Sequence, residues 1–208
     1  FDDESEELFV LAWTTTPWTL PSNTALAVGK KIKYVKIKTF NAYTFQPISV
    51  ILAKDLVGKY FSEKSKEISF SEYHEGDKLI PWEVFNEFSG EELLNVRFEQ
   101  LMPYVTNNDL VQNAFKIIEG DFVSTEDGTG IVHIAPTFGA DDFRVAKQAG
   151  VPGILIADED GNQMPLVDKQ GRFVAEVSDF AGRYVKGEYY SEEEQNHPDF
   201  KPTDVLIA

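Results

Sequence analysis

The chain has 208 residues, 42% of them hydrophobic and 13% aromatic, which is enough to bury a core within the usual size of one domain. Its formal net charge of −16 argues against broad electrostatic binding to nucleic acid, because such binders neutralise phosphates with Lys and Arg. Cysteine is absent, which excludes disulfides and thiolate zinc sites, and we find neither a signal peptide nor an apolar run of membrane-spanning length, so we expect a soluble, cytoplasmic protein.

The beginning of the chain is rich in strand-forming residues. The run from Leu8 to Trp13 is apolar and short, which predicts a buried strand that ends at the following threonines. Pro17 and Pro21 then exclude a continuous helix or ladder. Further elements are expected as strands over 24–28, 34–39 and 49–53 and as a helix over 54–62.

The rest of the chain alternates weak and clear signals. Residues 68–113 mix aromatic, acidic and structure-breaking residues and predict only short strands. Strands are clearer over 114–119 and 131–135, joined by a tight connection through Asp127-Gly128-Thr129-Gly130. The remaining predictions are a helix over 141–149, strands over 154–157, 173–177 and 184–185 in hairpins, and an acidic surface segment over about 186–200.

Many short strands with few helices predict an α+β fold that is predominantly β, a barrel or sandwich with peripheral helices. We find no internal repeat, and we expect a single domain over 1–208. Both ends of the chain are apolar and strand-like, which suggests a domain inserted in a larger protein.

The first candidate site follows the first strand. Thr14 and Thr16 are expected to face one way and Thr15 the other, because side chains alternate along a strand. Threonine is common in strands, so the triple alone favours a structural role. Pro17 and Trp18 favour a functional one, since they hold the backbone extended and place a flat wall beside the hydroxyls.

The second candidate site is the corner between the strand over 131–135 and the helix over 141–149. It contains the imidazole of His133, with Gly130 and Gly139 nearby to permit close backbone approach. One carboxylate at this corner is explained by helix capping, which we assign to Asp141. The spare carboxylate of Asp142 suits a substrate ammonium group as a charge-assisted partner.

Two alternatives use the same residues. A magnesium site built from Asp121, Asp141 and Asp142 would fit a metal-dependent phosphoesterase, although carboxylates are plentiful in this chain. A noncatalytic module that binds aminoacylated RNA is the other alternative. The sequence contains no G-x-S-x-G elbow, P-loop or G-x-G-x-x-G fingerprint.

Taken together, these motifs resemble the editing domain inserted in isoleucyl-tRNA synthetases. The resemblance rests on the segments from Trp13 to Asn23, from Gly128 to Pro136 and from Gly139 to Phe143. The related valyl and leucyl domains typically place arginine where Thr16 stands. Thr137-Phe138 replaces a glycine-histidine pair of many bacterial members, which points to a eukaryote-like branch.

The resemblance implies the β-barrel editing fold and the hydrolysis of tRNA(Ile) mischarged with valine. It implies catalytic roles for Thr15, His133 and Asp142, with Asp142 holding the α-amino group and His133 shaping the amino-acid end of the pocket. On chemical grounds we rank an orienting role for His133 above that of a general base. The implied pocket is lined by Thr14, Thr16, Trp18, Gly130, Ala135, Phe138 and Gly139.

The same resemblance implies the partners and cofactors. The partners are the valine-bearing 3′ end of tRNA(Ile) and the remainder of the synthetase, in a monomer without membrane contact. Editing is expected to need no metal or cofactor. ATP and magnesium would serve a catalytic domain that is absent here, because the HIGH and KMSKS signatures do not occur in the sequence.

Overall fold

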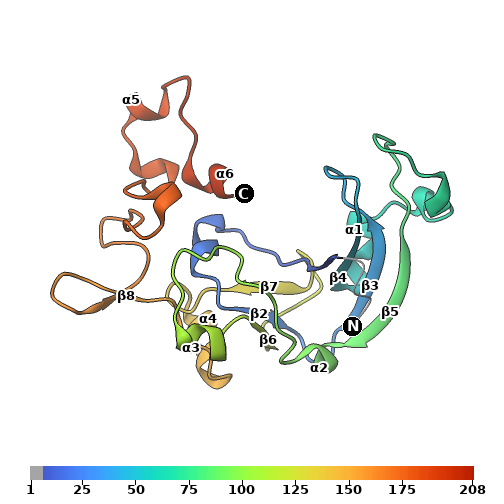
Figure 1. Ribbon diagram of the computed structural model, residues 1–208, viewed down its shortest axis with the longest axis horizontal. Helices are drawn as coiled ribbons and strands as arrows, with labels where there is room; N and C mark the ends of the chain where they lie inside the picture. The colour runs from blue at the N-terminus through green and yellow to red at the C-terminus, as the bar shows by residue number, and fades with distance from the viewer. Residues whose placement is uncertain (1–6) are drawn as a thin grey trace. The chain divides into compact units, whose positions relative to one another are not determined.

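The computed structural model describes residues 7–208, which form three sheets and a series of short helical segments (Figure 1). The strands are β1 (Glu7–Val10), β2 (Ala25–Val28), β3 (Lys33–Phe40), β4 (Pro47–Ala53), β5 (Glu83–Ser89), β6 (Lys116–Glu119), β7 (Ile131–Ile134), β8 (Ile156–Ala157) and β9 (Gln163–Met164). The α-helices are α1 (Val57–Tyr60), α2 (Gly90–Leu93), α3 (Asn108–Asn113), α4 (Ala140–Gln148), α5 (Glu192–Gln195) and α6 (Thr203–Ile207). The 3-10 helices are η1 (Pro17–Ser22), η2 (Lys54–Leu56), η3 (Glu63–Ser65), η4 (Phe70–Glu72), η5 (Ser178–Phe180) and η6 (Gly187–Tyr189).

The chain divides into two compact units. Unit 1 contains the described residues 7–13 together with Ala27–Leu94 and Glu119–Val132, and unit 2 contains Thr14–Leu26, Asn95–Ile118 and His133–Ala208. Strands β2, β6 and β7 each run from one unit into the other. The expectation of a single domain stays a prediction.

Unit 1 is built on a four-stranded sheet with the order β1-β4-β3-β5. Strand β3 is antiparallel to both neighbours, whereas β1 runs parallel to β4. Alternate residues of β3 and β4 point into one apolar cluster, which is what a period of two predicts for a strand with one buried face. The cluster contains Val35, Ile37, Ile48, Val50, Leu52, Val57 and Trp82.

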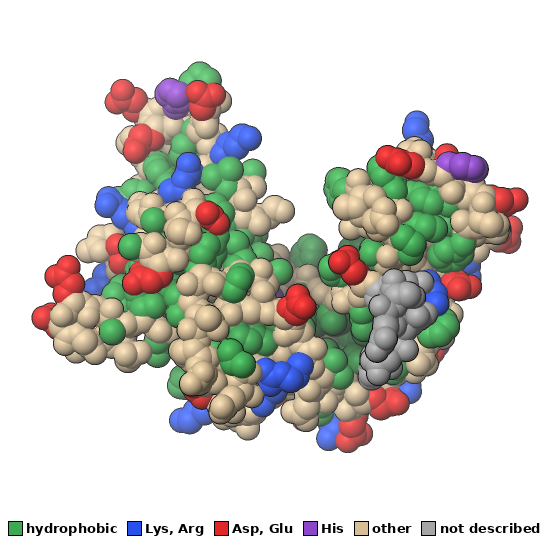
Figure 2. Space-filling view, viewed as in Figure 1, with side chains coloured by type: hydrophobic (Ala, Val, Ile, Leu, Met, Phe, Trp, Pro, Cys, Tyr) green, Lys and Arg blue, Asp and Glu red, His purple; other side chains and the backbone are tan. Residues whose placement is uncertain are grey.

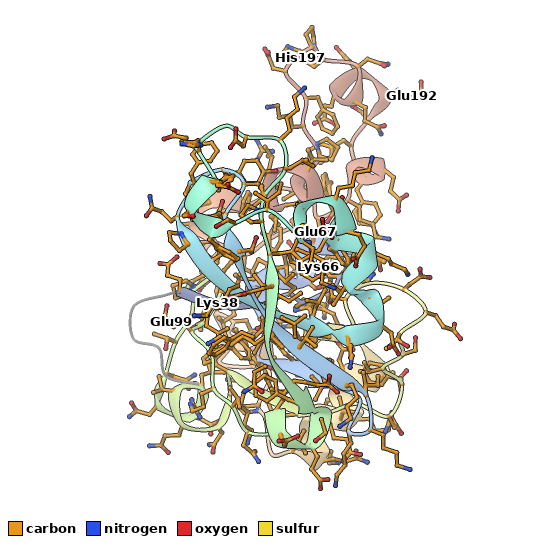
Figure 3. The ribbon with its side chains drawn as sticks, turned by 90° about the vertical axis from the view of Figure 1, so that its right-hand side faces the viewer. Lys38, Lys66, Glu67, Glu99, Glu192 and His197 are labelled. Carbon is orange, nitrogen blue, oxygen red and sulfur yellow. The ribbon has the colours of Figure 1, made fainter. Side chains whose placement is uncertain are left out.

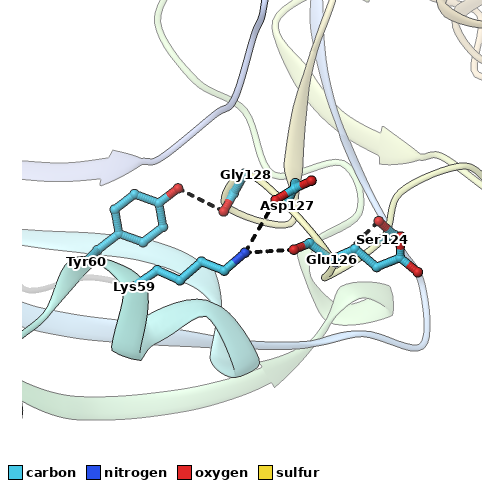
Figure 4. A network of polar contacts seen from close by, with 6 residues as sticks. All are labelled: Lys59, Tyr60, Ser124, Glu126, Asp127 and Gly128. Atoms are coloured by element: carbon cyan, nitrogen blue, oxygen red, sulfur yellow. Dashed lines mark hydrogen bonds and ion pairs between the residues drawn. The ribbon is translucent and has the colours of Figure 1, made fainter.

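The glycine-rich loop before β7 is held by α1 (Figure 4). The Tyr60 hydroxyl donates to the Gly128 carbonyl at 2.8 Å, and Lys59 Nζ donates to the Glu126 carbonyl at 2.7 Å. Gly130 has a φ of +73° and packs so closely on Ala53 that a Cβ there would meet the alanine methyl group. Both observations require glycine at position 130.

Several predicted strands are confirmed, but β6 and β7, which the glycine-rich loop joins, are not neighbours in their sheet. The strands predicted over 24–28, 34–39 and 49–53 correspond to β2, β3 and β4. The three-stranded sheet has the order β6-β2-β7, so β2 lies between the two strands that the glycine-rich loop joins. Gly128 and Gly130 do have positive φ angles, but the loop that contains them connects two strands on either side of β2.

Other expectations are corrected in their extent. The helix predicted over 54–62 is interrupted, because η2 precedes a single turn of α1. The middle of the chain contains a seven-residue strand, β5, where only short strands were expected. In the tail, where hairpins were expected, β8 and β9 form one hairpin. The strands predicted over 173–177 and 184–185 are reduced to isolated bridges, Phe173 with Val167 and Tyr184 with Arg172.

The barrel predicted for this chain is not found among residues 7–208. The sheets have four, three and two strands in linear order, and β1 and β5 at the ends of the largest sheet are not paired with each other. The fold is therefore a mixed arrangement of open sheets and short helices. No helix in the described part of the chain is both long and apolar enough to cross a membrane.

The surface carries its charges in a scattered pattern. Figure 2 shows acidic side chains spread over the visible face among basic and apolar ones. The predicted acidic segment is exposed and contains α5, whose N-cap Ser191 forms a capping box with Glu194. Figure 3 shows Glu192 and His197 of this segment with their side chains directed outward.

Candidate functional site

The threonine segment, defined as residues 14–23 of unit 2, contains η1. Thr16 is the N-cap residue of this 3-10 helix, and the Thr19 N–H donates to the Thr16 carbonyl at 3.0 Å. The Thr14 hydroxyl accepts from the Thr16 N–H at 3.1 Å. Thr15 and Thr16 are exposed and Thr14 is half-buried, so the segment presents hydroxyls at the surface of unit 2.

The two prolines of this segment do not prevent helical structure, contrary to the sequence-based expectation. Pro17 stands at the first position of η1, where its missing N–H would have had no partner. Pro21 lies inside the helix. A 3-10 helix of six residues tolerates it because so short an element depends on few internal hydrogen bonds.

His133, at the end of β7, is buried and hydrogen-bonded at both ring nitrogens. Its Nε2 lies 2.9 Å from the Thr19 hydroxyl, and its Nδ1 lies 2.7 Å from the Asn23 side-chain nitrogen. The residue is 6% exposed. The predicted imidazole therefore joins the threonine segment, although the bond is made through Thr19 and not through the three successive threonines.

The neighbours of His133 determine its tautomer. Asn23 Nδ2 also lies 2.9 Å from the Ala25 carbonyl, so this atom must be the amide nitrogen and must donate to His133 Nδ1. The ring proton is then on Nε2 and is donated to Thr19, whose hydroxyl donates to the Thr16 carbonyl at 2.8 Å. Burial lowers the pKa of His133 to about 4, so the ring is neutral at physiological pH.

The acidic pair at the start of α4 is divided differently from the prediction. Gly139 is the N-cap residue, without a side-chain cap, and the exposed Asp141 lies 3.3 Å from Arg144. Asp142 is the residue that binds backbone, because its Oδ2 accepts from the Ala135 N–H at 2.8 Å. The assignment of the cap to Asp141 is wrong. Asp141 is the second residue of the helix, and its exposed side chain pairs with the Arg144 guanidinium.

Asp142 is half-buried, and its surroundings disfavour the charged form of its carboxyl group. Burial raises the pKa of its carboxyl above the usual range, against the hydrogen bonds from backbone N–H groups, and the charge of Asp141 raises it further. Gly139 makes room for this carboxylate, because a Cβ at position 139 would lie 2.8 Å from Asp142 Cγ. A cationic group beside Asp142 would relieve the cost of burying its charge.

Two aromatic rings close one side of this region. Trp18 and Phe138 meet edge to face with centroids 5.0 Å apart. The indole nitrogen of Trp18 and the hydroxyl of Thr137 are buried and, within residues 7–208, have no hydrogen-bond partner. Unpaired buried donors are costly, so these two groups mark a local cost in the packing of this region.

Unit 2 thus contains most of the predicted site residues. Thr14, Thr15, Thr16 and Trp18 belong to it, as do His133, Ala135, Phe138, Gly139 and Asp142. Gly130 belongs to unit 1 and has the loop surroundings described above. The predicted magnesium site is not formed, because the described residues contain no group of three or more His, Cys, Asp or Glu side chains that could hold a metal ion.

Three polar residues that contact the site were not predicted from the sequence. Thr19 and Asn23 bind the two ring nitrogens of His133, and both lie within the motif that begins at Trp13, which was their only sequence signal. Asp204 accepts the Trp18 N–H at 2.9 Å from near the other end of the chain. No pattern in the sequence connects positions 18 and 204.

Comparisons with known proteins agree with this architecture. No family model matches the chain. The chain is 60% identical over 191 residues to the isoleucine–tRNA ligase of Cytophaga hutchinsonii, covering 92% of the chain and 17% of that protein. It is 48% identical over 197 residues to the isoleucine–tRNA ligase of Bacteroides fragilis, covering 87% of the chain and 17% of that protein.

The chain therefore spans about a sixth of the length of these curated relatives. The relatives are bacterial, and the predicted eukaryote-like branch is not confirmed. The crystal structure of GlLeuRS-CP1 has a similar fold, with a TM-score of 0.54 and 15% identity over 87% of this chain and 73% of that chain. The chain is thus homologous to a region of isoleucine–tRNA ligases and has a fold similar to that of GlLeuRS-CP1.

Proposed function

We propose that this chain is the editing domain of an isoleucine–tRNA ligase and hydrolyses the aminoacyl ester of valyl-tRNA(Ile), releasing valine and tRNA. One observation carries the proposal. Within unit 2 the threonine segment and the segment from His133 to Asp142 meet twice, at the Thr19–His133 hydrogen bond and at the contact between Trp18 and Phe138. The proposed partners are the 3′ end of tRNA(Ile) carrying valine and the remainder of the ligase chain.

The arrangement suits selection of a small amino acid. In this class of enzyme, the methylene that distinguishes isoleucine from valine is worth only about 1–3 kcal/mol of binding, too little for accurate translation. A second pocket can instead exclude the larger side chain by steric overlap. Trp18, Phe138 and the buried His133 supply rigid walls for such a pocket, since each is fixed by an aromatic or hydrogen-bond contact.

The polar groups suit an ester that carries a free amino group. Asp142 would bind the α-ammonium group, whose positive charge would offset the cost of holding a half-buried carboxylate in its charged form. The hydroxyls of Thr14, Thr15 and Thr16 would hydrogen-bond the ribose, the ester carbonyl and the attacking water. A threonine hydroxyl is too weakly acidic to act as an unaided base, so we assign Thr15 to ordering the water, without a covalent intermediate.

His133 would orient its neighbours and would not act as the general base. Its Nδ1 already accepts from Asn23 and its Nε2 already donates to Thr19, so no lone pair is left to receive a proton from water. Its lowered pKa makes it a weak base. The ring therefore serves as a fixed wall that also aligns Thr19 and, through it, Thr16.

The test is deacylation of preformed valyl-tRNA(Ile) by the full-length protein that carries this chain. Asp142→Asn keeps an acceptor for the Ala135 N–H and removes the charge. Losing a hydrogen bond to a charged group costs about 1.5–3 kcal/mol, so we expect a roughly 10- to 150-fold slower reaction. Asp141→Asn, the neighbouring exposed carboxylate, is the control and should react at the wild-type rate.

Three results would contradict the proposal. Wild-type hydrolysis by Asp142→Asn would remove Asp142 from the site. Saturable binding of valyl-tRNA(Ile) without turnover would favour the noncatalytic RNA-binding module. Inhibition by EDTA would show that hydrolysis needs a metal, for which the described residues provide no cluster.

A further inference from the structure

Thr16 stands at the N-cap of η1 but does not cap it. An N-cap threonine ordinarily uses its side-chain oxygen to accept the N–H of the second or third helical residue. The Thr16 side chain makes no such bond, although the residue is in the N-cap position. The first N–H groups of η1 therefore find acceptors elsewhere.

Each of these groups can be accounted for. Pro17, at the first position, has no N–H. The Thr19 N–H is taken by the Thr16 backbone carbonyl at 3.0 Å. The Trp18 N–H donates to the Asp204 carboxylate at 2.9 Å, across 186 positions of sequence. Asp204 thus supplies the acceptor that the local residue would otherwise supply.

Asp204 is held in place by the structure around α6. Its neighbour Thr203 is fully buried and donates its hydroxyl proton to the Tyr184 carbonyl at 2.6 Å. The Tyr184 ring packs against Tyr190 with centroids 5.1 Å apart, and Tyr190 packs against Phe200 at 5.0 Å. Helix α6 contacts η1 within unit 2, where Figure 1 shows the two segments close together.

This division of bonds leaves the Thr16 hydroxyl available. The side chain is exposed, and its hydroxyl makes one long hydrogen bond, at 3.4 Å to the Thr19 hydroxyl, whose own proton goes to the Thr16 carbonyl. Had Thr16 capped η1 itself, its oxygen would face the Trp18 N–H. The same bond from Asp204 fixes the backbone of Trp18, the residue whose ring contacts Phe138.

We propose that Asp204 is a positioning residue of the site: it caps η1 in place of Thr16, which frees the Thr16 hydroxyl for the substrate and fixes the Trp18 wall. The identity of that substrate rests on the proposed function. The capping itself does not, so the two can be tested separately.

Hydrogen exchange tests the capping without reference to activity. In the full-length protein we would follow the amides of the peptide covering residues 14–23 by mass spectrometry. Asp204→Ala should speed exchange of one amide, that of Trp18, at least tenfold. Asp204→Asn keeps an oxygen acceptor and should exchange like the wild type. Equal protection in Asp204→Ala and the wild type would overturn the proposal.

Kinetics test the positioning. In deacylation of valyl-tRNA(Ile), Asp204→Ala should lower kcat by about tenfold with KM changed less than twofold, because misaligned groups lose reactivity before affinity. Asp204→Asn should restore most of the rate. Glu193→Ala removes an exposed carboxylate of α5 in the same C-terminal region and should leave the rate unchanged.

A double-mutant cycle tests the claim about Thr16. If Thr16 turns to cap η1 in Asp204→Ala, then Thr16→Val should slow that variant much less than it slows the wild type. If the effects of the two substitutions on the rate multiply, Asp204 does not free Thr16. If Asp204→Asn fails to restore the rate, the role of Asp204 as an acceptor is overturned. If the wild type does not hydrolyse valyl-tRNA(Ile), the proposed function fails, and the exchange result still decides whether Asp204 caps η1.

Discussion

The buried imidazole of His133 should make the stability of this chain depend on pH in a defined window. Burial lowers the pKa of His133 from its ordinary value of 6.5 to about 4. Between these two values the unfolded chain binds a proton that the folded chain does not. The free energy of unfolding must therefore fall as pH is lowered through this window, and it is unaffected by His133 above it.

The magnitude follows from the pKa difference. Each pKa unit corresponds to about 1.36 kcal/mol, so lowering the pH from 7 to 5 should cost roughly 2 kcal/mol through this one group. The loss reaches about 3 kcal/mol at pH 4 and levels off just below that pH. This is a substantial share of the 5–15 kcal/mol that is typical of a folded domain.

The assay is urea unfolding of the full chain at pH 7 and pH 5, with His133→Gln as the matched variant. The variant lacks the titrating ring but retains the other ionisable groups, so the difference between the two proteins isolates His133. Asp142, whose raised pKa acts in the opposite direction at the acidic end, is present in both and cancels. We expect the stability advantage of the wild type to shrink by about 2 kcal/mol at pH 5.

A wild-type advantage that stays constant between pH 7 and pH 5 would refute the reasoning, since it would mean that the ring titrates equally in the folded and unfolded chains. A larger advantage at pH 5 would show that the folded state prefers the charged ring. That would require a different proton arrangement from the one imposed by Asn23 and Thr19.

Two further substitutions test the packing around the site and the glycine loop. Asn23→Ala removes the donor to His133 Nδ1 and to the Ala25 carbonyl, and it should lower the free energy of unfolding by about 2–3 kcal/mol. Urea titration would measure this loss, and an unchanged unfolding midpoint would contradict it. Gly130→Ala combines a φ of +73° with a clash against Ala53 and should cost more than about 2 kcal/mol, whereas Gly161→Ala has a φ of +82° but open space and should cost only about 1–2 kcal/mol. Equal losses of melting temperature in these two variants would mean that the contact at Ala53 relaxes freely.

Local sequence patterns determined the elements that bury an alternating or helical apolar face. Strands β2, β3 and β4 and helix α4 were predicted to within two residues at each end, because their side-chain period and the turn residues around them are local properties. Short strands were expected over 68–113, but the position and length of β5 were not predicted, because five of its seven residues are exposed and carry no alternation. It is a strand because β3 offers it hydrogen-bond partners. The order of the second sheet was likewise not contained in local patterns, since β2 lies between β6 and β7 although it comes from a distant part of the chain.

The site shows the same division. Sequence motifs alone identified the threonine segment, His133 and Asp142 as candidate site residues. They did not determine that Thr19 binds His133, that Asp142 and not Asp141 holds backbone, or that Asp204 caps η1. A periodic pattern describes neighbours a few positions apart, whereas a hydrogen bond is decided by which donor and acceptor the fold brings within about 3 Å. Only the tertiary structure could choose those partners.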